Sequence, residues 1–248
     1  MPCKVCGNAK TVKSHLLPKS IIIGLHGESR RAFSGARDRL GTQSTQGGEF
    51  DSNILCLEHE GMLSDCDNYG VKFFKAFDRS ARGPKGFEDV IYVVPNPKPS
   101  LLLKFVLSVV WRHALSGRYG QPNPLNLGPW EPELRNKIFF GTSYDPDFCI
   151  AQQDFIIGES RHSEIVMPPY HNYNFGRRGF EFYVMGFRLT VKLDGQSKGR
   201  MPKLLRANGQ NPVLVFRPDA ITVTDEPDIM VILKNMRSKV QLGEVLIT

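Results

Sequence analysis

In the first 80 positions, the pattern of apolar and polar residues predicts a long loop followed by a helix. The stretch 24–50 is rich in Gly, Ser, Thr, Gln and Arg and has no apolar period, which is typical of an exposed loop. Apolar residues return at 53–56. Beyond them, large apolar side chains repeat at helical spacing over 59–79, so we expect a helix there.

The chain beyond residue 80 has a pattern of its own. A segment rich in Gly, Pro and basic residues at 80–86 is typical of a hinge, so we expect one domain over 1–80 and a second over 81–248. Apolar periodicity in the second domain predicts helices over 100–115, 131–140 and 228–237, and strands over 90–94, 149–157, 164–167, 180–193, 213–216 and 220–223. This succession indicates an α+β fold with a mainly antiparallel sheet.

No segment has the pattern of a membrane span or a secretory signal. The longest apolar run, 101–111, is about half the length needed to cross a bilayer and is interrupted by Lys104. Arg112 and His113 follow it and are expected to cap the C-terminus of a buried helix. The N-terminus carries no apolar signal segment. We therefore expect a cytoplasmic protein without membrane association, whose thiols stay reduced.

The cysteines indicate metal binding rather than a disulfide framework, because their number is odd and two of them form a CxxC pair at the N-terminus. Zinc prefers four cysteine or histidine ligands in a tetrahedron, and structural sites are usually built from two ligand pairs. Cys3 and Cys6 are the first pair, and Cys56 and His59 are the second. We therefore predict a structural Zn²⁺ site. The alternative ligand set has Cys66 in place of His59.

The segment 13–19, with the sequence KSHLLPK, lies between the two ligand pairs. Here the sequence resembles the zinc-containing HNH nuclease family. In that family a CxxC is followed by an acidic residue, a histidine, two apolar residues and a proline, and later by an Asn near a second CxxC that opens a helix. The resemblance covers residues 1–67 and implies a zinc-stapled, treble-clef-like ββα-metal module. It also implies one divalent cation held against the scissile phosphate.

The resemblance assigns His15 to the position of the family's general base. The chemistry is suitable, because a neutral imidazole near pH 7 can take a proton from water. Asn53, or alternatively Asp51, matches the family's central Asn, which orients the loop that bears the base. The structural alternative for His15 is a hydrogen bond to a backbone carbonyl that holds the turn beside Pro18.

The resemblance further implies a catalytic cation, Mg²⁺ or Mn²⁺, next to the second zinc pair. Glu60 directly follows that pair, where the family usually has His or Asn, and a carboxylate suits a hard cation. Asp65 and Asp67 are further candidates, and a solvated helix face is their structural alternative. A Glu in a first helical turn is also favoured by the helix dipole alone. Two features depart from the family: Ser14 replaces the acidic residue before the histidine, and the second zinc pair is CxxH.

The stretch 160–206 carries most of the excess positive charge. The formal net charge of the chain is +7, whereas residues 1–80 hold 11 basic and nine acidic side chains. The stretch holds nine basic and three acidic residues, interleaved with the aromatic residues Tyr170, Tyr173, Phe175, Phe180, Phe182, Tyr183 and Phe187. The basic side chains of such a segment can bind a phosphate backbone, and its aromatic rings can stack on bases. It equally fits a β-hairpin whose rings are core and whose charges are a solvated face.

The leading hypothesis from the sequence is a metal-dependent endonuclease that hydrolyses phosphodiester bonds, with DNA as the favoured partner, bound through 160–206. The resemblance implies a bacterial defence or toxin effector. The alternative is a non-catalytic zinc-binding module for nucleic acid or protein, with Ser14 marking a lost active site. No Walker loop, GxGxxG, GxSxG or HExxH motif is present, so nucleotide-driven and serine-hydrolase chemistry lack support. Homo-oligomerisation stays open.

Overall fold

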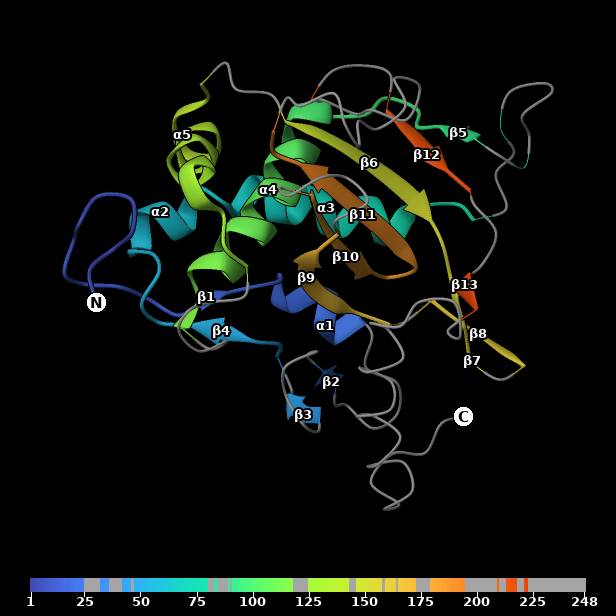
Figure 1. The fold of residues 1–248 in the computed structure, drawn as a ribbon, viewed down its shortest axis with the longest axis horizontal. Coiled ribbons are helices and arrows are strands. Elements are labelled where there is room, and N and C mark those ends of the chain that lie inside the picture. Colours follow the sequence, from blue (N-terminus) through green and yellow to red (C-terminus); the bar gives the residue numbers. More distant parts are fainter. Residues whose placement is uncertain are drawn as a thin grey trace.

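Helices pack against a mainly antiparallel sheet in a mixed α+β structure (Figure 1). The computed structural model describes residues 1–24, 32–35, 42–45, 47–79, 83, 89, 91–117, 125–142, 146–157, 159–163, 165–172, 179–194, 209, 213–217 and 221–222. The expected helix at 228–237 and all of the expected hinge at 80–86 except Gly83 lie outside these residues. The expected α+β class with an antiparallel-rich sheet is confirmed.

The N-terminal part contains short strand pairs and short helices. Its elements are β1 (Ser14–His15), α1 (Lys19–Gly24), β2 (Ala32–Gly35), β3 (Thr42–Thr45), β4 (Phe50–Asp51), α2 (Leu57–Gly61) and α3 (Ser64–Ala76). β1 pairs with β4 and β2 pairs with β3, both antiparallel. The loop expected over 24–50 therefore contains a small sheet. Its strands pair through their backbones, which requires no apolar period in the sequence.

The helix expected over 59–79 is divided into two helices, α2 and α3, which are separated by Met62 and Leu63. Gly61, a weak helix former, is the last residue of α2. Leu63 is buried, and its carbonyl accepts a hydrogen bond from the Cys66 thiol at 3.1 Å. The break separates a short helix at the surface from a longer helix that packs into the core.

The second part of the chain contributes the main sheet and two longer helices. Its elements are β5 (Ile91–Val93), α4 (Pro99–Leu115), η2 (Gly128–Trp130), α5 (Glu131–Phe140), β6 (Asp147–Gln152), β7 (Phe155–Ile157), β8 (Ser160–His162), β9 (Met167–His171), β10 (Gly179–Val184), β11 (Phe187–Lys192), β12 (Leu214–Phe216) and β13 (Ile221–Thr222). The main sheet has the order β5-β12-β6-β11-β10-β9, with β12 parallel to β6 and the other described pairs antiparallel. Strands β13, β7 and β8 form a separate small sheet.

Two expected strands are each divided in the structure. The stretch 149–157 forms β6 and β7, and the stretch 180–193 forms the hairpin β10–β11. Met185 and Gly186 turn this hairpin with φ values of 51° and 74°. A two-residue turn with positive φ at both positions matches the twist of the paired strands, so the chain reverses there.

The edge strand β9 lies later in the chain than the strand expected at 164–167. It includes Pro168 and Pro169, which have no N–H to donate to a neighbouring strand. These prolines are tolerated because β9 is the last strand of the sheet and has a partner on one side.

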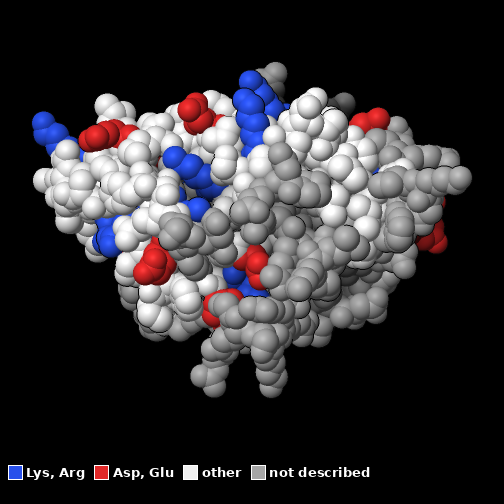
Figure 2. Space-filling model, turned by 90° about the horizontal axis from the view of Figure 1, so that it is seen from above, with Lys and Arg blue, Asp and Glu red and all other residues white. Residues whose placement is uncertain are grey.

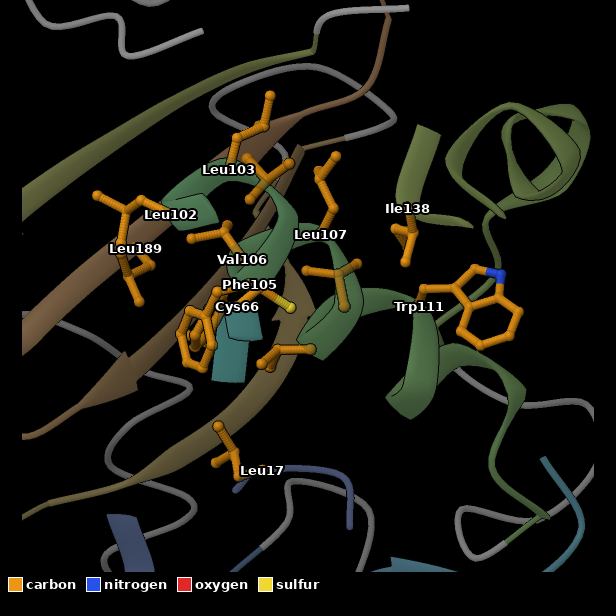
Figure 3. Packing of buried hydrophobic residues seen from close by; sticks show 14 of the residues in the cluster. Leu17, Cys66, Leu102, Leu103, Phe105, Val106, Leu107, Trp111, Ile138 and Leu189 are labelled. Atoms are coloured by element: carbon orange, nitrogen blue, oxygen red, sulfur yellow. The ribbon is translucent and has the colours of Figure 1, made fainter. Parts of the chain in front are cut away.

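Helix α4 lies at the centre of the hydrophobic core (Figure 3). It contributes apolar side chains that are at most 2% exposed, among them Leu102, Leu103, Phe105, Val106, Leu107 and Trp111. Gly70 allows α3 to approach closely, since a Cβ atom there would lie 2.5 Å from the Phe105 ring. The same cluster includes Cys66 from the first 80 residues and Leu189 from the sheet. The core is therefore continuous across residue 80.

None of the described helices is long and apolar enough to cross a membrane. The apolar run at 101–111 lies within α4, where its side chains are largely buried. Packing against α3 and the sheet therefore accounts for the apolar character of this run.

Candidate metal centre and adjoining pocket

Four side chains near the N-terminus bring their ligand atoms together. The sulfurs of Cys3, Cys6 and Cys56 and a ring nitrogen of His59 all lie within 4.8 Å of one another. The Cys6 and Cys56 sulfurs are 3.8 Å apart, and Nδ1 of His59 lies 3.1 Å from the Cys56 sulfur and 3.9 Å from the Cys3 sulfur. Zn–S bonds of about 2.3 Å place two sulfurs of a tetrahedron about 3.8 Å apart. The predicted ligand set is therefore gathered at a spacing that a metal ion such as zinc could occupy.

The first ligand pair sits on a tight backbone turn. The N–H of Gly7 donates to the Cys3 carbonyl at 2.9 Å. Gly7 has a φ of 74°, a left-handed conformation that glycine adopts without a steric penalty. The N–H of Lys4 donates to the Ile54 carbonyl at 2.8 Å, which ties the turn to the segment that leads into α2. This backbone bond brings the two ligand pairs together.

The second ligand pair opens helix α2. Cys56 is the N-cap residue, with an extended backbone, and His59 lies in the first turn. Residues three apart on a helix share a face, so His59 lies on the same side as Cys56. The His59 ring is buried and packs edge-on against Phe139 of α5, with 5.4 Å between ring centroids. A helix from the second part of the chain therefore closes the metal centre.

Cys66, the alternative ligand, is outside this group. Its thiol donates to the Leu63 carbonyl, and burial raises its pKa to about 12. For the Cys3 thiol, burial acts in the same direction, but the backbone N–H groups of Cys6 and Val5 outweigh it and lower the pKa. Donors directed at a sulfur in this way stabilise the thiolate that a metal ion binds. The Cys66 thiol is therefore engaged by a backbone carbonyl outside the group of four ligand atoms.

An open pocket of about 430 Å³ lies next to the metal centre. Three residues singled out from the sequence line it: His15 of β1, Glu60 of α2 and Asp67 of α3. Lys19 at the start of α1 and Asn68 of α3 also line it. The fold therefore places an imidazole, two carboxylates and a lysine around one solvent-accessible space.

His15 is half-buried, and its ring centroid is 6.1 Å from that of Phe50 on the paired strand. Burial lowers the pKa of His15, and the positive charges of Lys13 and Lys19 lower it further. The imidazole is therefore neutral near pH 7 and able to accept a proton. This is the protonation state that a general base requires.

The Glu60 carboxylate is partly buried beside the side chain of Ser14. Burial raises the pKa of Glu60, and the Ser14 hydroxyl and the backbone N–H of His15 offset part of that rise. Ser14 is fully buried, and among the described residues neither its hydroxyl nor Oε2 of Glu60 has a partner at full hydrogen-bond geometry. A hydroxyl, and not a carboxylate, therefore lies beside Glu60.

Asp67 is held by an arginine that the sequence pattern does not connect to the site. Arg112 of α4 is fully buried, and its two Nη atoms donate to the two Asp67 oxygens at 3.0 and 2.9 Å. It also donates to the hydroxyl and the carbonyl of Ser108, at 3.2 and 3.3 Å. The sequence predicts a helix cap at Arg112, because an arginine near a helix end carries no sign of a partner on another helix.

The other candidates from the sequence are not part of the pocket lining. Asn53 is exposed, and its side-chain oxygen accepts a hydrogen bond from the Met1 amine at 3.2 Å. Asp51 is buried and accepts a hydrogen bond from the Ser116 hydroxyl at 3.1 Å, which ties β4 to the end of α4. Asp65 is exposed on α3. Of the expected carboxylates on α3, the structure therefore brings Asp67, and not Asp65, to His15 and Glu60.

The pocket carboxylates are farther apart than the metal-centre ligands. Across the described residues, the Cys3/Cys6/Cys56/His59 set is the one group of three or more His, Cys, Asp or Glu side chains close enough to share an ion. His15, Glu60 and Asp67 share a pocket without forming such a group. A cation there would need oxygens from substrate or water to complete its ligand shell.

The basic and aromatic stretch 160–206 is described over part of its length. Four of its rings are at most 1% exposed and belong to the interior: Phe180, Phe182, Tyr183 and Phe187. For these four rings, the structure agrees with the interpretation of the stretch as a β-hairpin whose rings belong to the core. Arg188 pairs with Glu181 at 3.2 Å, and Lys192 pairs with Asp194. Of the other basic residues of the stretch, Arg161 belongs to β8, and the remaining six lie outside the part of the chain that the structure describes.

Comparisons with known proteins add no family to this picture. The chain matches no protein-family model, no curated protein and no solved structure. A functional proposal therefore rests on the geometry of the metal centre and of the pocket beside it.

Proposed function

We propose that the chain is a metal-dependent endonuclease, built on an HNH-like zinc module, that cleaves phosphodiester bonds, with DNA as the favoured substrate. The observation that carries this proposal is the pocket in which His15 of β1 faces the same space as Glu60 of α2 and Asp67 of α3. An imidazole beside carboxylates has the chemistry that phosphodiester hydrolysis requires. The order of the Cys3–Cys6 turn, the paired strands β1 and β4, and the ligand-bearing helix α2 supports a treble-clef-like ββα-metal arrangement.

Zinc has a structural role in this proposal. The cysteine and histidine ligands fill a tetrahedron and leave no open position for substrate. The ion would hold the N-terminal turn against α2 and thereby position Glu60, the residue after His59. Cysteines without disulfide partners also suit a reducing, cytoplasmic setting.

His15 is the proposed general base. Its neutral imidazole would take a proton from the water molecule that attacks the phosphorus. Lys19, which lines the same pocket, would attract the negative phosphate. Burial and neighbouring lysines keep the pKa of His15 below its usual value, so the base form persists below pH 6.5.

Glu60 would hold Mg²⁺ or Mn²⁺, with Asp67 as a second oxygen donor. When bound, the cation supplies positive charge that stabilises the developing charge on the phosphate. Arg112 already engages both oxygens of Asp67, and Ser14 offers a hydroxyl in place of a carboxylate. Substrate oxygens would therefore complete the coordination, and we expect weak cation binding without nucleic acid.

A cleavage assay tests the proposal. Zinc-loaded protein is incubated with plasmid DNA and with single-stranded RNA, with and without added Mg²⁺ or Mn²⁺. We expect cleavage with the added cation, and a rate lower by about 10²-fold or more in His15→Ala at equal zinc content. His171→Gln, which removes a half-buried imidazole from β9, is the matched control and should cleave as the wild type does.

A second candidate function is a non-catalytic zinc module that binds nucleic acid or protein. The position of Asn53 favours it, because its side chain meets the Met1 amine instead of the pocket. Ser14 also favours this second function, because its hydroxyl supplies no carboxylate to hold a catalytic cation. Such a module would bind its partner equally well with and without His15, and neither protein would cleave either substrate.

A further inference from the structure

Exposed lysines flank the pocket at both ends of helix α1. Lys19, at the start of α1, lines the pocket and lies close enough to His15 to affect its charge. Lys75, near the end of α3, reaches the other end of α1, where a Cβ atom on Gly24 would lie 2.8 Å from the Lys75 Cε. Positive charge therefore stands on two sides of the space that His15 faces.

A row of side chains on α3 connects the pocket with Lys75. Ser64 and Asn68 line the pocket, one helical turn apart. Residues three or four apart lie on one face of a helix, so Lys72 follows Asn68 and Lys75 follows Lys72 on that face. Ser64, Asn68, Lys72 and Lys75 are all exposed, and the row is therefore open to solvent along the length of α3.

The acidic side chains nearby leave this row positively charged. Asp67 is neutralised by Arg112, and Glu60 is partly buried inside the pocket. Asp65 is exposed and lies about 20° around the helix from Lys72, two turns away, so it offsets one of the positive charges of Lys19, Lys72 and Lys75. Within the described residues, no ion pair engages the lysines of the row.

Several described arginines are engaged by neighbours: Arg79 by Asp154, Arg112 by Asp67 and Arg135 by the Lys4 carbonyl. In the main sheet, Arg188 and Lys192 are paired with acidic neighbours. On the face shown in Figure 2, basic and acidic side chains of the described residues are interspersed, without a patch of one sign. Among the described residues, the row on α3 and Lys19 connect positive charge to the pocket that His15 lines.

We propose that Lys19, Lys72 and Lys75 form a lysine track that binds the phosphate backbone of a nucleic acid strand and leads it along α3 into the pocket. This inference rests on the proposed endonuclease function, and it moves the expected nucleic-acid contact from 160–206 to α1 and α3. A lysine that neutralises a phosphate releases counterions, which strengthens binding roughly tenfold per contact at 0.1 M salt. Because these contacts go to the backbone, the track positions a strand without reading its bases.

Binding of a short fluorescent DNA duplex tests the track, with single-stranded RNA of the same sequence as a second probe. Every protein carries His15→Ala, so that the probe stays intact, and titrations are made at several salt concentrations without added Mg²⁺. For Lys72→Glu combined with Lys75→Glu, we expect a Kd raised roughly 100-fold and a salt slope lowered by about 2. The control combines Lys10→Glu with Lys98→Glu, which makes the same change in net charge at exposed lysines off the row. Its Kd should stay within about threefold of the parent value, because no phosphate contact is lost.

Two results would overturn the track: equal weakening in the two double variants, or parent-like binding by the Lys72/Lys75 variant. Zinc content and melting temperature are compared in all proteins, so that a loss of fold is recognised. Cleavage is measured separately, in proteins that retain His15. Selective loss of binding without any cleavage by the wild type supports the track and refutes the nuclease. Cleavage by the wild type with unchanged binding by the Lys72/Lys75 variant refutes the track alone.

Discussion

The metal centre and the pocket beside it share one short helix but are assembled differently. His59 belongs to the metal centre, and Glu60, the next residue, lines the pocket. The metal ligands come from two short segments, and backbone hydrogen bonds from Lys4 to Ile54 and from Val12 to Leu55 join these parts of the chain. The pocket takes its groups from β1, α2 and α3, and the arginine that holds Asp67 comes from α4.

This difference shows how two sites in one module depend on the rest of the fold. A four-ligand site needs two local turns, and the ion itself supplies free energy that holds them together. The pocket has no such internal source of stability, so its geometry depends on how α3 packs against α4. Substitution of a metal ligand should therefore disrupt the fold, whereas substitutions in the pocket should mainly change its charge and the local stability.

Removal of a metal ligand should have the largest effect. Cys56→Ser leaves an incomplete ligand set, and we expect zinc content well below one per chain and loss of the cooperative melting transition, because zinc binding contributes directly to folding. Metal analysis and circular dichroism measure both. Cys149→Ser, which alters a half-buried thiol outside the ligand group, is the control. Full zinc content in Cys56→Ser would contradict the assigned ligand set.

The next largest effect should come from the arginine beneath the pocket. Arg112→Met leaves the Asp67 carboxylate, which is 18% exposed, without its partner. Removing one member of a buried pair costs about 3–5 kcal/mol, which urea denaturation can measure. Adding Asp67→Asn to this variant should recover part of the loss, since the unpaired charge is then gone. Wild-type stability of Arg112→Met would mean that the pocket does not depend on α4.

Acid should destabilise α4 through a histidine next to that arginine. Burial, with a smaller contribution from the nearby Arg112, lowers the pKa of His113 from 6.5 to about 4. Between those pH values the unfolded chain binds the proton and the folded chain does not, so stability falls as the pH drops through this window. The loss should approach about 3 kcal/mol at pH 4.

His113→Leu removes this titration, and the difference in pH dependence between the two proteins is the quantity to measure. The free energy of unfolding of the wild type alone does not isolate the effect of His113, because zinc ligands are also protonated in acid. Identical pH profiles of unfolding in wild type and His113→Leu would exclude His113 as the source of the acid sensitivity.

The smallest effect should come from adding a carboxylate to the pocket at position 14, where the resemblance to the HNH family implies an acidic residue. Ser14→Asp places a second carboxylate beside Glu60, and like-charge repulsion with burial should cost about 1–2 kcal/mol in the absence of cation. Added Mn²⁺ should restore the melting temperature, because two carboxylates can then share one ion. Ser14→Asn, which adds similar bulk without charge, should not respond. A Mn²⁺ response that is equal in the two variants would argue against a cation at this pocket.

The sequence predicts some elements well because their signals are local. Apolar periodicity locates α4 and α5 within about two residues, a precision that is usual for helix ends. It does not reveal the turn at Met185 and Gly186, which lies in an unbroken run of strand-like residues. It also does not reveal the break between α2 and α3, since the side chains on either side keep helical spacing. In both places the backbone reverses or bends to meet partners elsewhere in the fold.

For the sites, the sequence by itself predicted the four side chains that the structure gathers, with Cys66 as the alternative to His59, because CxxC and CxxH spacing already places each pair of ligands on one turn. The resemblance to the HNH family offered His15, Glu60 and Asp67 as candidates. Only the tertiary structure decided that these three residues share a pocket, that Asp65 and Asn53 lie outside it, and that Arg112 holds Asp67. The physical reason is that such contacts join residues far apart in the chain, and they form only when α3, α4 and the sheet bury a common core.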